Sequence, residues 1–354
     1  MYRHGHSHIP VKMIWGDCQL QVAKWRCAKD RLVVTVYPER LDSSGLSPES
    51  LKRCLDLSTR LPFREALEAL KIQDMEISRG RHERLSQGYG KQVLQNLEHW
   101  VAEAEELESD AYKLPESYVV QIDGVMVLET DKPVKGQCEG REVKQVLIHK
   151  LGDSTEKHHI AQACTSDNFQ DWTKALAKQV GIHKEDYLIG LADGALWIDE
   201  AFAALGIRLR ILDVYHATEY LDKVMKALNY DDETRQAHRA SWCRGDINAR
   251  LWLKHHLPED SVIHTWSDEA QQAVTYLQKR LDQMDYWSFK EKGYPIGSGA
   301  IEGANKSVIG ARMKRSGMRW SKDGVNRMAA LRSLQTTSEP WIDFHQTRLL
   351  AFNL

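Results

Sequence analysis

The feature that most constrains the fold is a run of three strand-like segments followed by alternating helix and strand patterns. Residues 118–127 form a mostly apolar segment rich in β-branched residues, which is typical of a buried strand, and 143–149 and 157–164 are further strand candidates. A helical pattern follows, with Trp172, Leu176 and Val180 four residues apart. Strand patterns return at 187–192 and 207–212. The order β-β-β-α-β-α-β predicts an α/β fold with a mixed sheet and helices on its faces.

That order of elements is the order of a ribonuclease-H-like core, and the rest of the chain is organised around it. We expect a small β-rich unit at 1–46, followed by a helical region at 47–116 that contains a helix-turn-helix pattern. The first part of the core covers 117–216, and an all-helical insertion covers 217–290. The second part of the core covers 291–354.

Composition narrows the class of protein. Forty-eight Lys and Arg against 50 Asp and Glu give a net charge of −2, so any nucleic-acid contact must use a local basic face. The 6 cysteines have no dense spacing, which excludes a secreted disulfide scaffold and favours a reducing cytoplasm. The sequence has no apolar run of about 18 residues, so we expect a soluble protein without a membrane partner.

Three aspartates follow strand patterns and are candidates for chemistry. Asp123 and Asp193 each precede a glycine, and ligands bind beyond the carboxyl ends of parallel strands. An Asp-Gly pair by itself is equally a simple turn signal. Asp213 ends the next predicted strand and rivals Asp193, because spacing alone does not separate the two.

A fourth acid, Glu302, follows a glycine-rich stretch at the start of a predicted helix. Asn305 and Lys306 stand three and four residues later, on the same helical face. A first-turn glutamate is also favoured by the helix dipole alone, so this pattern is weak by itself.

A basic segment follows Glu302. Residues 306–332 hold eight Lys or Arg against one Asp, with Met318 and Trp320 interleaved. A solvated charged helix is the usual interpretation of such a run, but we favour DNA phosphate contacts. The DNA-binding candidates are Lys306, Arg312, Lys314, Arg315, Arg319 and Lys322.

Four sequence blocks resemble transposases of the ISKra type, a bacterial insertion-sequence family related to the Mutator-like group. They read YVVQIDG, LADGALWI, ILDVYHATEYL and YPIGSGAIEGANKSVIGARMKRSGMRWSKDG, and they occur in the family's order. The resemblance implies a ribonuclease-H-like fold with a DDE triad, which corresponds here to Asp123, Asp193 and Glu302. The related group has an Asp-x-x-His block after the second acid, so the resemblance places Asp213 and His216 beside the ligands, with Asn305 near them.

The chemistry of phosphodiester cleavage explains why carboxylates are needed. Two Mg²⁺ ions, with Mn²⁺ as a substitute, can deprotonate the nucleophile and stabilise the leaving oxygen. Such hard cations prefer oxygen ligands. Together with this chemistry, the resemblance implies a DDE transposase that cuts the terminal inverted repeats of its element and joins them to target DNA, as a homo-oligomer in the bacterial cytoplasm and nucleoid.

Two alternatives from other classes stay open at this point. One is a non-catalytic DNA-binding protein derived from a transposase, and the other is a ribonuclease-H-like nuclease or resolvase without strand transfer. The N-terminal unit also departs from the family pattern. Members of the family often carry a Cys-x-x-Cys zinc-ribbon-like element, whereas Cys18 and Cys27 here lack zinc-ligand spacing, which suggests a degenerate element.

Overall fold

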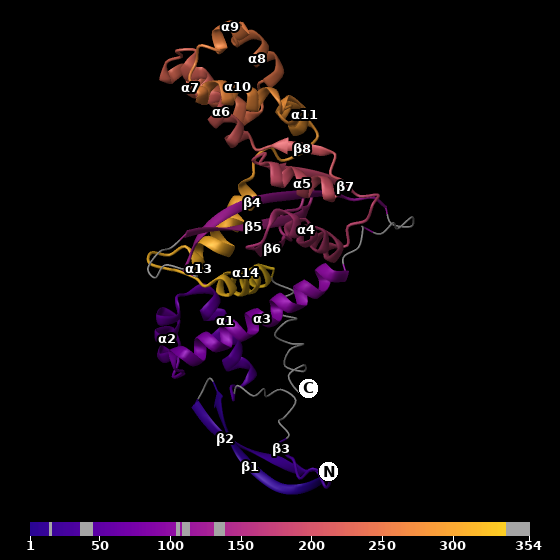
Figure 1. Ribbon diagram of the computed structural model, residues 1–354, viewed down its shortest axis with the longest axis vertical. Helices are drawn as coiled ribbons and strands as arrows, with labels where there is room; N and C mark the ends of the chain where they lie inside the picture. Colours follow the sequence, from indigo (N-terminus) through magenta and orange to yellow (C-terminus); the bar gives the residue numbers. More distant parts are fainter. Residues whose placement is uncertain (14–15, 36–44, 104–106, 108–113, 131–138, 338–354) are drawn as a thin grey trace. The chain divides into compact units, whose positions relative to one another are not determined.

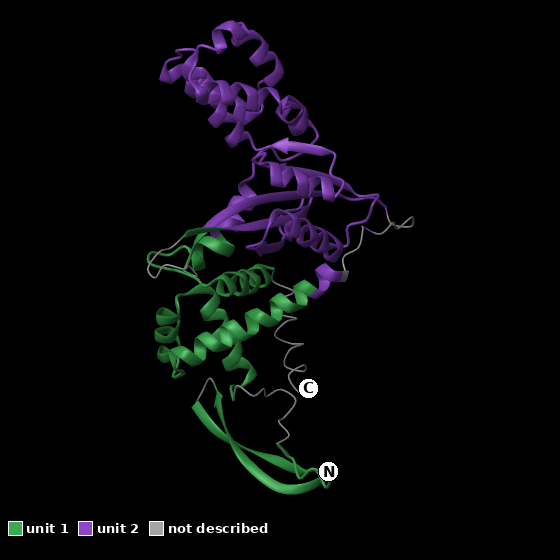
Figure 2. Ribbon diagram, viewed as in Figure 1, with its two compact units in different colours: residues 1–98, 127–141, 307–354 green, residues 99–126, 142–306 purple. Residues whose placement is uncertain are grey.

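The computed structural model describes residues 1–13, 16–35, 45–103, 107, 114–130 and 139–337. The chain forms two compact units, and neither is continuous in sequence (Figure 2). Unit 1 contains residues 1–98, 127–141 and 307–354, and unit 2 contains residues 99–126 and 142–306. The five-part division that the sequence suggests stays a prediction.

A five-stranded mixed sheet organises unit 2. Its strands are β4 (Ser117–Glu129), β5 (Glu139–Lys150), β6 (His158–Gln162), β7 (Tyr187–Ala192) and β8 (Leu209–Leu212), in the order β6-β5-β4-β7-β8 (Figure 1). The β5–β6 pair is antiparallel, whereas β4–β7 and β7–β8 are parallel. The final residues of β4 and the first of β5 are grouped with unit 1. This mixed sheet is compatible with a ribonuclease-H-like core, and the order of its elements is the one expected from the sequence.

The burial of the central strand, β4, explains its nearly continuous run of apolar residues. Tyr118, Val119, Val120 and Ile122 of β4 are all buried, as expected for a strand with both faces covered. Helices α4 (Ser166–Val180) and α5 (Leu196–Ala204) connect the strands that follow. Helix α4 ends at Gly181, which takes the left-handed conformation that glycine permits.

Between β8 and residue 291 the described chain contains helices and no strand. These are α6 (Val214–Ala227), α7 (Asp232–Arg244), α8 (Ala249–His256), α9 (Asp260–Ile263), α10 (Asp268–Gln278), a 3-10 turn at Leu281–Gln283, and α11 (Tyr286–Glu291). Trp242, Trp252 and Tyr286 lie in the apolar core of these helices. Large aromatic side chains thus supply much of the buried surface that holds the helices together.

The chain then continues through α12 (Gly299–Ala304), a π-helical turn at Asn305–Gly310, and α13 (Ala311–Met313) to α14 (Lys322–Thr336). A π-helical turn is rare and is found mainly at functional positions of helices.

The described part of unit 1 combines a small sheet with helices. The antiparallel sheet contains β1 (Tyr2–Met13), β2 (Gly16–Arg26) and β3 (Val33–Thr35). Helices α1 (Pro48–Arg60), α2 (Phe63–Ile72) and α3 (Arg79–Glu103) follow, and α2 and α3 correspond to the helix-turn-helix pattern. Leu55, Leu70 and Leu331 lie in their shared core.

The structure shows where two of the cysteines lie and whether its helices could cross a membrane. Cys18 is exposed on β2 and Cys27 follows the end of that strand, and both are free thiols. None of the helices in the described residues has the length and apolar character that a membrane span requires.

Candidate active site

Strand register brings the predicted aspartates to one edge of the sheet. The last paired residues of the parallel strands β4 and β7 are Gln121 and Leu191. Asp123 and Asp193 each stand two residues beyond that pair. Neighbouring strands are about 4.8 Å apart, so equal register places the two aspartates near each other. Ala192 pairs with Leu212 of β8, which puts Asp213 next along the same edge.

The local structure at Asp123 differs from the turn that the sequence suggested. Strand β4 continues through Asp123 and Gly124 to Glu129, so the Asp-Gly pair lies inside a strand. The parallel partner β7 ends at Ala192, and β5 continues alongside β4 on its other edge. A Cβ added at Gly124 would lie 2.3 Å from the Glu142 carboxylate oxygen, so a larger residue here would displace the end of that side chain.

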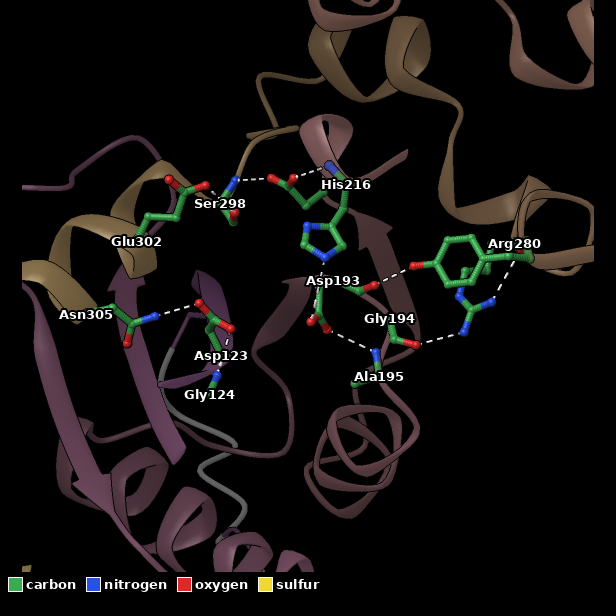
Figure 3. Close-up of polar contacts among 12 residues, drawn as sticks. Asp123, Gly124, Asp193, Gly194, Ala195, His216, Arg280, Ser298, Glu302 and Asn305 are labelled. Atoms are coloured by element: carbon green, nitrogen blue, oxygen red, sulfur yellow. Dashed lines mark hydrogen bonds and ion pairs between the residues drawn. The ribbon is translucent and has the colours of Figure 1, made fainter. Parts of the chain in front are cut away.

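Asp193 is partly open to solvent at the end of β7. Its Oδ1 accepts a hydrogen bond from the backbone N–H of Ala195 at 3.0 Å, and its side chain is 33% exposed. The Nε2 atom of His216 lies 4.0 Å from Asp193 Oδ2 (Figure 3). His216 is therefore beside the second acid, on the first turn of α6.

Asp213 has a different environment, although it also follows a strand. Its side chain is 1% exposed and caps α6, with Oδ1 accepting from the His216 N–H at 2.8 Å. Oδ2 accepts from the Ser298 N–H at 2.6 Å. Both oxygens are thus engaged by backbone donors, so Asp213 ties β8 to the segment before α12. This geometry favours Asp193 over its rival as the open acid.

Glu302 extends from the first turn of α12 into the same region (Figure 3). Its carboxylate accepts from Ser298 Oγ at 3.3 Å and lies 4.0 Å from the Lys306 ammonium. The Glu302 side chain is 46% exposed. Helix α12 is held against β4 because the Ile301 N–H donates to the side-chain oxygen of Gln121 at 3.0 Å.

Asn305 makes direct contact with the first acid. It opens the π-helical turn, and its Nδ2 donates to Asp123 Oδ2 at 2.5 Å. The Gly124 N–H donates to the other carboxylate oxygen at 2.7 Å. The Oδ1 atom of Asn305 is buried and makes no hydrogen bond within the described residues. Asn305 is therefore a neighbour of Asp123.

The electrostatics of the site suit a divalent cation. Burial raises the pKa of the Asp123 carboxyl, and the negative charges of Asp193 and Glu302 raise it further. A bound cation would relieve this repulsion, and three carboxylates are the hard oxygen donors that Mg²⁺ prefers. Within the described residues no three Asp, Glu, His or Cys side chains gather closely enough to hold a metal by themselves. Mg²⁺ commonly keeps water and takes substrate phosphate oxygens as further ligands, so the donor set fits such a shared site.

In unit 1, the structure corrects one of the DNA-binding candidates. Arg312 is 1% exposed, and its guanidinium lies 5.0 Å from the Phe63 ring and 4.9 Å from the Trp320 ring. Its Nε donates to the Ser58 carbonyl at 2.6 Å. Burial lowers the pKa of Arg312 to about 10, and the nearby charges of Arg315 and Arg332 add to this effect. Arg312 is thus a buried packing residue and cannot reach a phosphate in this structure.

The remaining basic candidates differ in exposure and in their contacts with the protein. Lys314, Arg319 and Lys322 are exposed residues of unit 1. Arg315 is engaged by Glu65 at 2.8 Å and by the Ala311 carbonyl at 2.9 Å. Lys306 in unit 2 is 82% exposed. Their contact with DNA stays a prediction.

Sequence reasoning missed several residues that build the site. Gln121 binds α12, and the Ser298 N–H binds Asp213. Two residues of the helical insertion, Tyr276 and Arg280, bind the backbone after β7. No local pattern could have revealed Tyr276, because it is 83 residues from Asp193.

Comparisons with known proteins add little to these observations. No family model and no curated protein matches the chain. Among solved structures, the chain is similar to a Drosophila P element transposase strand transfer complex, with 12% identity and a TM-score of 0.31. The alignment covers 86% of this chain and 81% of that chain. Function must therefore be inferred from the side chains of the site.

Proposed function

We propose that this protein is a DDE transposase of the ISKra type, which cleaves DNA at the ends of its element and transfers the freed strand to target DNA. The observation that supports the proposal is that the charges of Asp193 and Glu302 both act on the Asp123 carboxyl, which has the same strand register as Asp193 (Figure 3). These acids come from β4, from the end of β7 and from α12. Carboxylates in that arrangement are typical of metal-dependent phosphoryl transfer.

Each residue of the site has a distinct role in the proposed reaction. Asp123, Asp193 and Glu302 would hold two Mg²⁺ ions, which supply charge stabilisation and activation of the attacking hydroxyl group. Asn305 fixes the rotamer of Asp123 by donating to its Oδ2 atom. Asp213 holds the N-terminus of α6, and thereby the position of His216 beside Asp193.

DNA binding is assigned to the exposed basic residues. We infer that Lys306, Lys314, Arg319 and Lys322 contact phosphates, which positions the DNA without reading its sequence. Since two element ends must be joined to one target, the active species is expected to be a homo-oligomer on DNA.

A strand-transfer assay tests this proposal. Duplexes that carry the DNA flanking the coding region are incubated with the full chain, a supercoiled target plasmid, and Mg²⁺ or Mn²⁺. We expect a joined product that disappears on chelation and in the Asp123→Asn, Asp193→Asn and Glu302→Gln variants, while DNA binding persists. Nicks without joined product would favour a nuclease or resolvase. Binding without any cleavage, in both metals, would favour a non-catalytic DNA-binding protein.

A further inference from the structure

Two side chains of the helical insertion bind the backbone immediately after β7. The hydroxyl of Tyr276 on α10 donates to the carbonyl oxygen of Asp193. Arg280, two residues after α10 ends, donates from its guanidinium to the carbonyl oxygen of Gly194 at 2.7 Å (Figure 3). Successive carbonyl groups at the second acid are therefore both held by residues more than 80 positions later in sequence.

Both side chains are themselves fixed in place. The Tyr276 ring stacks on the Tyr220 ring with centroids 3.7 Å apart and planes at 10°. The Arg280 guanidinium lies 3.9 Å from the centre of the Tyr276 ring and also donates to the Tyr276 carbonyl at 3.3 Å. Burial raises the pKa of the Tyr276 hydroxyl, so this group stays protonated and can donate at neutral pH. These contacts limit the rotamers available to either side chain.

The turn that they hold requires glycine for two reasons. Gly194 has a φ of +77°, in the left-handed region that other residues rarely adopt. A Cβ at this position would also lie 2.7 Å from Arg280 Nε and 2.9 Å from the Tyr276 hydroxyl oxygen. The backbone conformation after Asp193 and the two side chains that bind it are thus mutually dependent.

We propose that Tyr276 and Arg280 are positioning residues that fix the Asp193 carboxylate for metal binding. This inference rests on the proposed function, in which Asp193 is a metal ligand. The direct polar contacts of the Asp193 carboxylate are the Ala195 N–H and the ring of His216 at 4.0 Å. Its direction therefore depends on the backbone at residues 193–195, and that backbone is held by the insertion. The insertion completes the catalytic site as well as extending the fold.

Mn²⁺ binding to the full-length protein in complex with a duplex that carries the DNA flanking the coding region tests this inference, because substrate phosphates are expected to complete the metal site. The same duplex without protein gives the background. The dissociation constant for Mn²⁺ is measured by electron paramagnetic resonance of the free ion, in wild type and in variants. Tyr276→Phe keeps the stacked ring and loses only the hydroxyl, and Tyr220→Phe is the matched control because it removes the hydroxyl of the other ring in the stack. We expect Tyr276→Phe to weaken Mn²⁺ binding about 5-fold, since groups that orient metal ligands typically contribute about 10- to 100-fold when they act directly. Tyr220→Phe should bind Mn²⁺ as wild type does.

Variants of Arg280 provide a second, independent test of the inference. Arg280→Ala should weaken Mn²⁺ binding about 10-fold, and Arg280→Lys should recover part of the loss because an ammonium can still donate to the Gly194 carbonyl. The Mg²⁺ concentration for half-maximal cleavage should rise in parallel, with DNA affinity unchanged. A purely structural role would lower the thermal midpoint and leave the Mn²⁺ affinity of the folded protein unchanged.

The outcomes separate this inference from the proposed function. If wild type binds Mn²⁺ through Asp193 but Tyr276→Phe and Arg280→Ala bind it equally well, the positioning role is wrong. If the variants weaken binding as expected but wild type forms no strand-transfer product, the positioning role stands and transposition is wrong. If wild type binds no Mn²⁺, both are overturned.

Discussion

The acidic edge of the unit 2 sheet and the basic segment of unit 1 both concentrate charge, but they differ in what determines the environment of each charged residue. At the sheet edge, Asp123 and Asp193 stand at equal register on neighbouring parallel strands, where backbone geometry determines their placement. In the basic segment, neighbouring cations have opposite environments: Arg312 is buried between two rings, whereas Lys314 is exposed. A residue's register in the sheet thus predicts where its charge lies, and a count of charges does not.

The sharpest test of this comparison uses the two rival aspartates. We expect Asp193→Asn to slow DNA cleavage about 1,000-fold, because about 4 kcal/mol of transition-state charge stabilisation corresponds to that factor. Its thermal midpoint should be that of wild type. Asp213→Asn should mainly destabilise the protein, by about 1–3 kcal/mol, because one of two buried N–H donors loses its acceptor. Cleavage rates and unfolding curves for both variants check this, and the opposite pattern would assign the ligand role to Asp213.

The next largest effect concerns the buried cation. Arg312→Ala should destabilise the protein by about 2–4 kcal/mol, because it leaves a cavity and removes two cation–π contacts and a hydrogen bond. Lys314→Ala, two residues later and exposed, should change stability by less than about 0.5 kcal/mol. Thermal unfolding of the two variants without DNA measures the difference. Equal stability would mean that Arg312 is not buried in solution.

Salt dependence tests the exposed cations. Replacing Lys314 and Arg319 together with Ala should reduce the slope of log K against log salt by about 1.8, since each phosphate contact contributes about 0.9. Arg327 is paired with Asp323 at 2.7 Å, so Arg327→Ala is the matched control and should leave the slope unchanged. Titrations on one duplex at several salt concentrations give the slopes. If the double variant keeps the wild-type slope, these two residues do not contact phosphate.

The smallest expected effect is on the pH dependence of stability in the Asp123→Asn variant. Because the pKa of Asp123 is raised in the folded protein, ionisation of this carboxyl destabilises the fold, and stability falls as pH rises through the ordinary aspartate range toward the folded pKa. The thermal midpoint of Asp123→Asn relative to wild type, measured in the presence of chelator, should therefore rise from acidic pH to pH 7. At acidic pH wild-type Asp123 is protonated, so the difference there reports only the lost hydrogen-bond acceptor. A difference between the two midpoints that does not change with pH would contradict the raised pKa.

Sequence patterns predicted the sheet and its edge well because they reflect burial and period. The apolar run in β4 and the strand before Asp193 correspond to buried strands. The turn predicted at Asp123 was wrong, because β4 continues through Asp123 and Gly124 and has β5 as its neighbour in the sheet. Pairing with a later strand leaves no signal in the local sequence.

The environments of Arg312 and Tyr276 could not be predicted from the sequence, because they depend on residues that are far away along the chain. Arg312 is buried because Phe63 and Trp320 pack against it, and Phe63 lies in α2, far from Arg312 in the sequence. The contact between Tyr276 and Asp193 depends on the packing of several helices. Such contacts depend on tertiary structure, whereas propensity and periodicity report only on neighbours along the chain.

The ends of the helical insertion lie next to each other, and this has a consequence for how the protein can be altered. The Val214 N–H donates to the Ile296 carbonyl at 2.9 Å, directly beside the link from Ser298 to Asp213. A segment whose two ends meet can be exchanged or replaced by a short linker with little strain on its host, as in natural domain insertions. A chain trimmed in this way would keep the five strands and all three acids but lose Tyr276 and Arg280. It would be a shortened scaffold in which a new insertion could be selected to hold the backbone at Asp193 and Gly194 again.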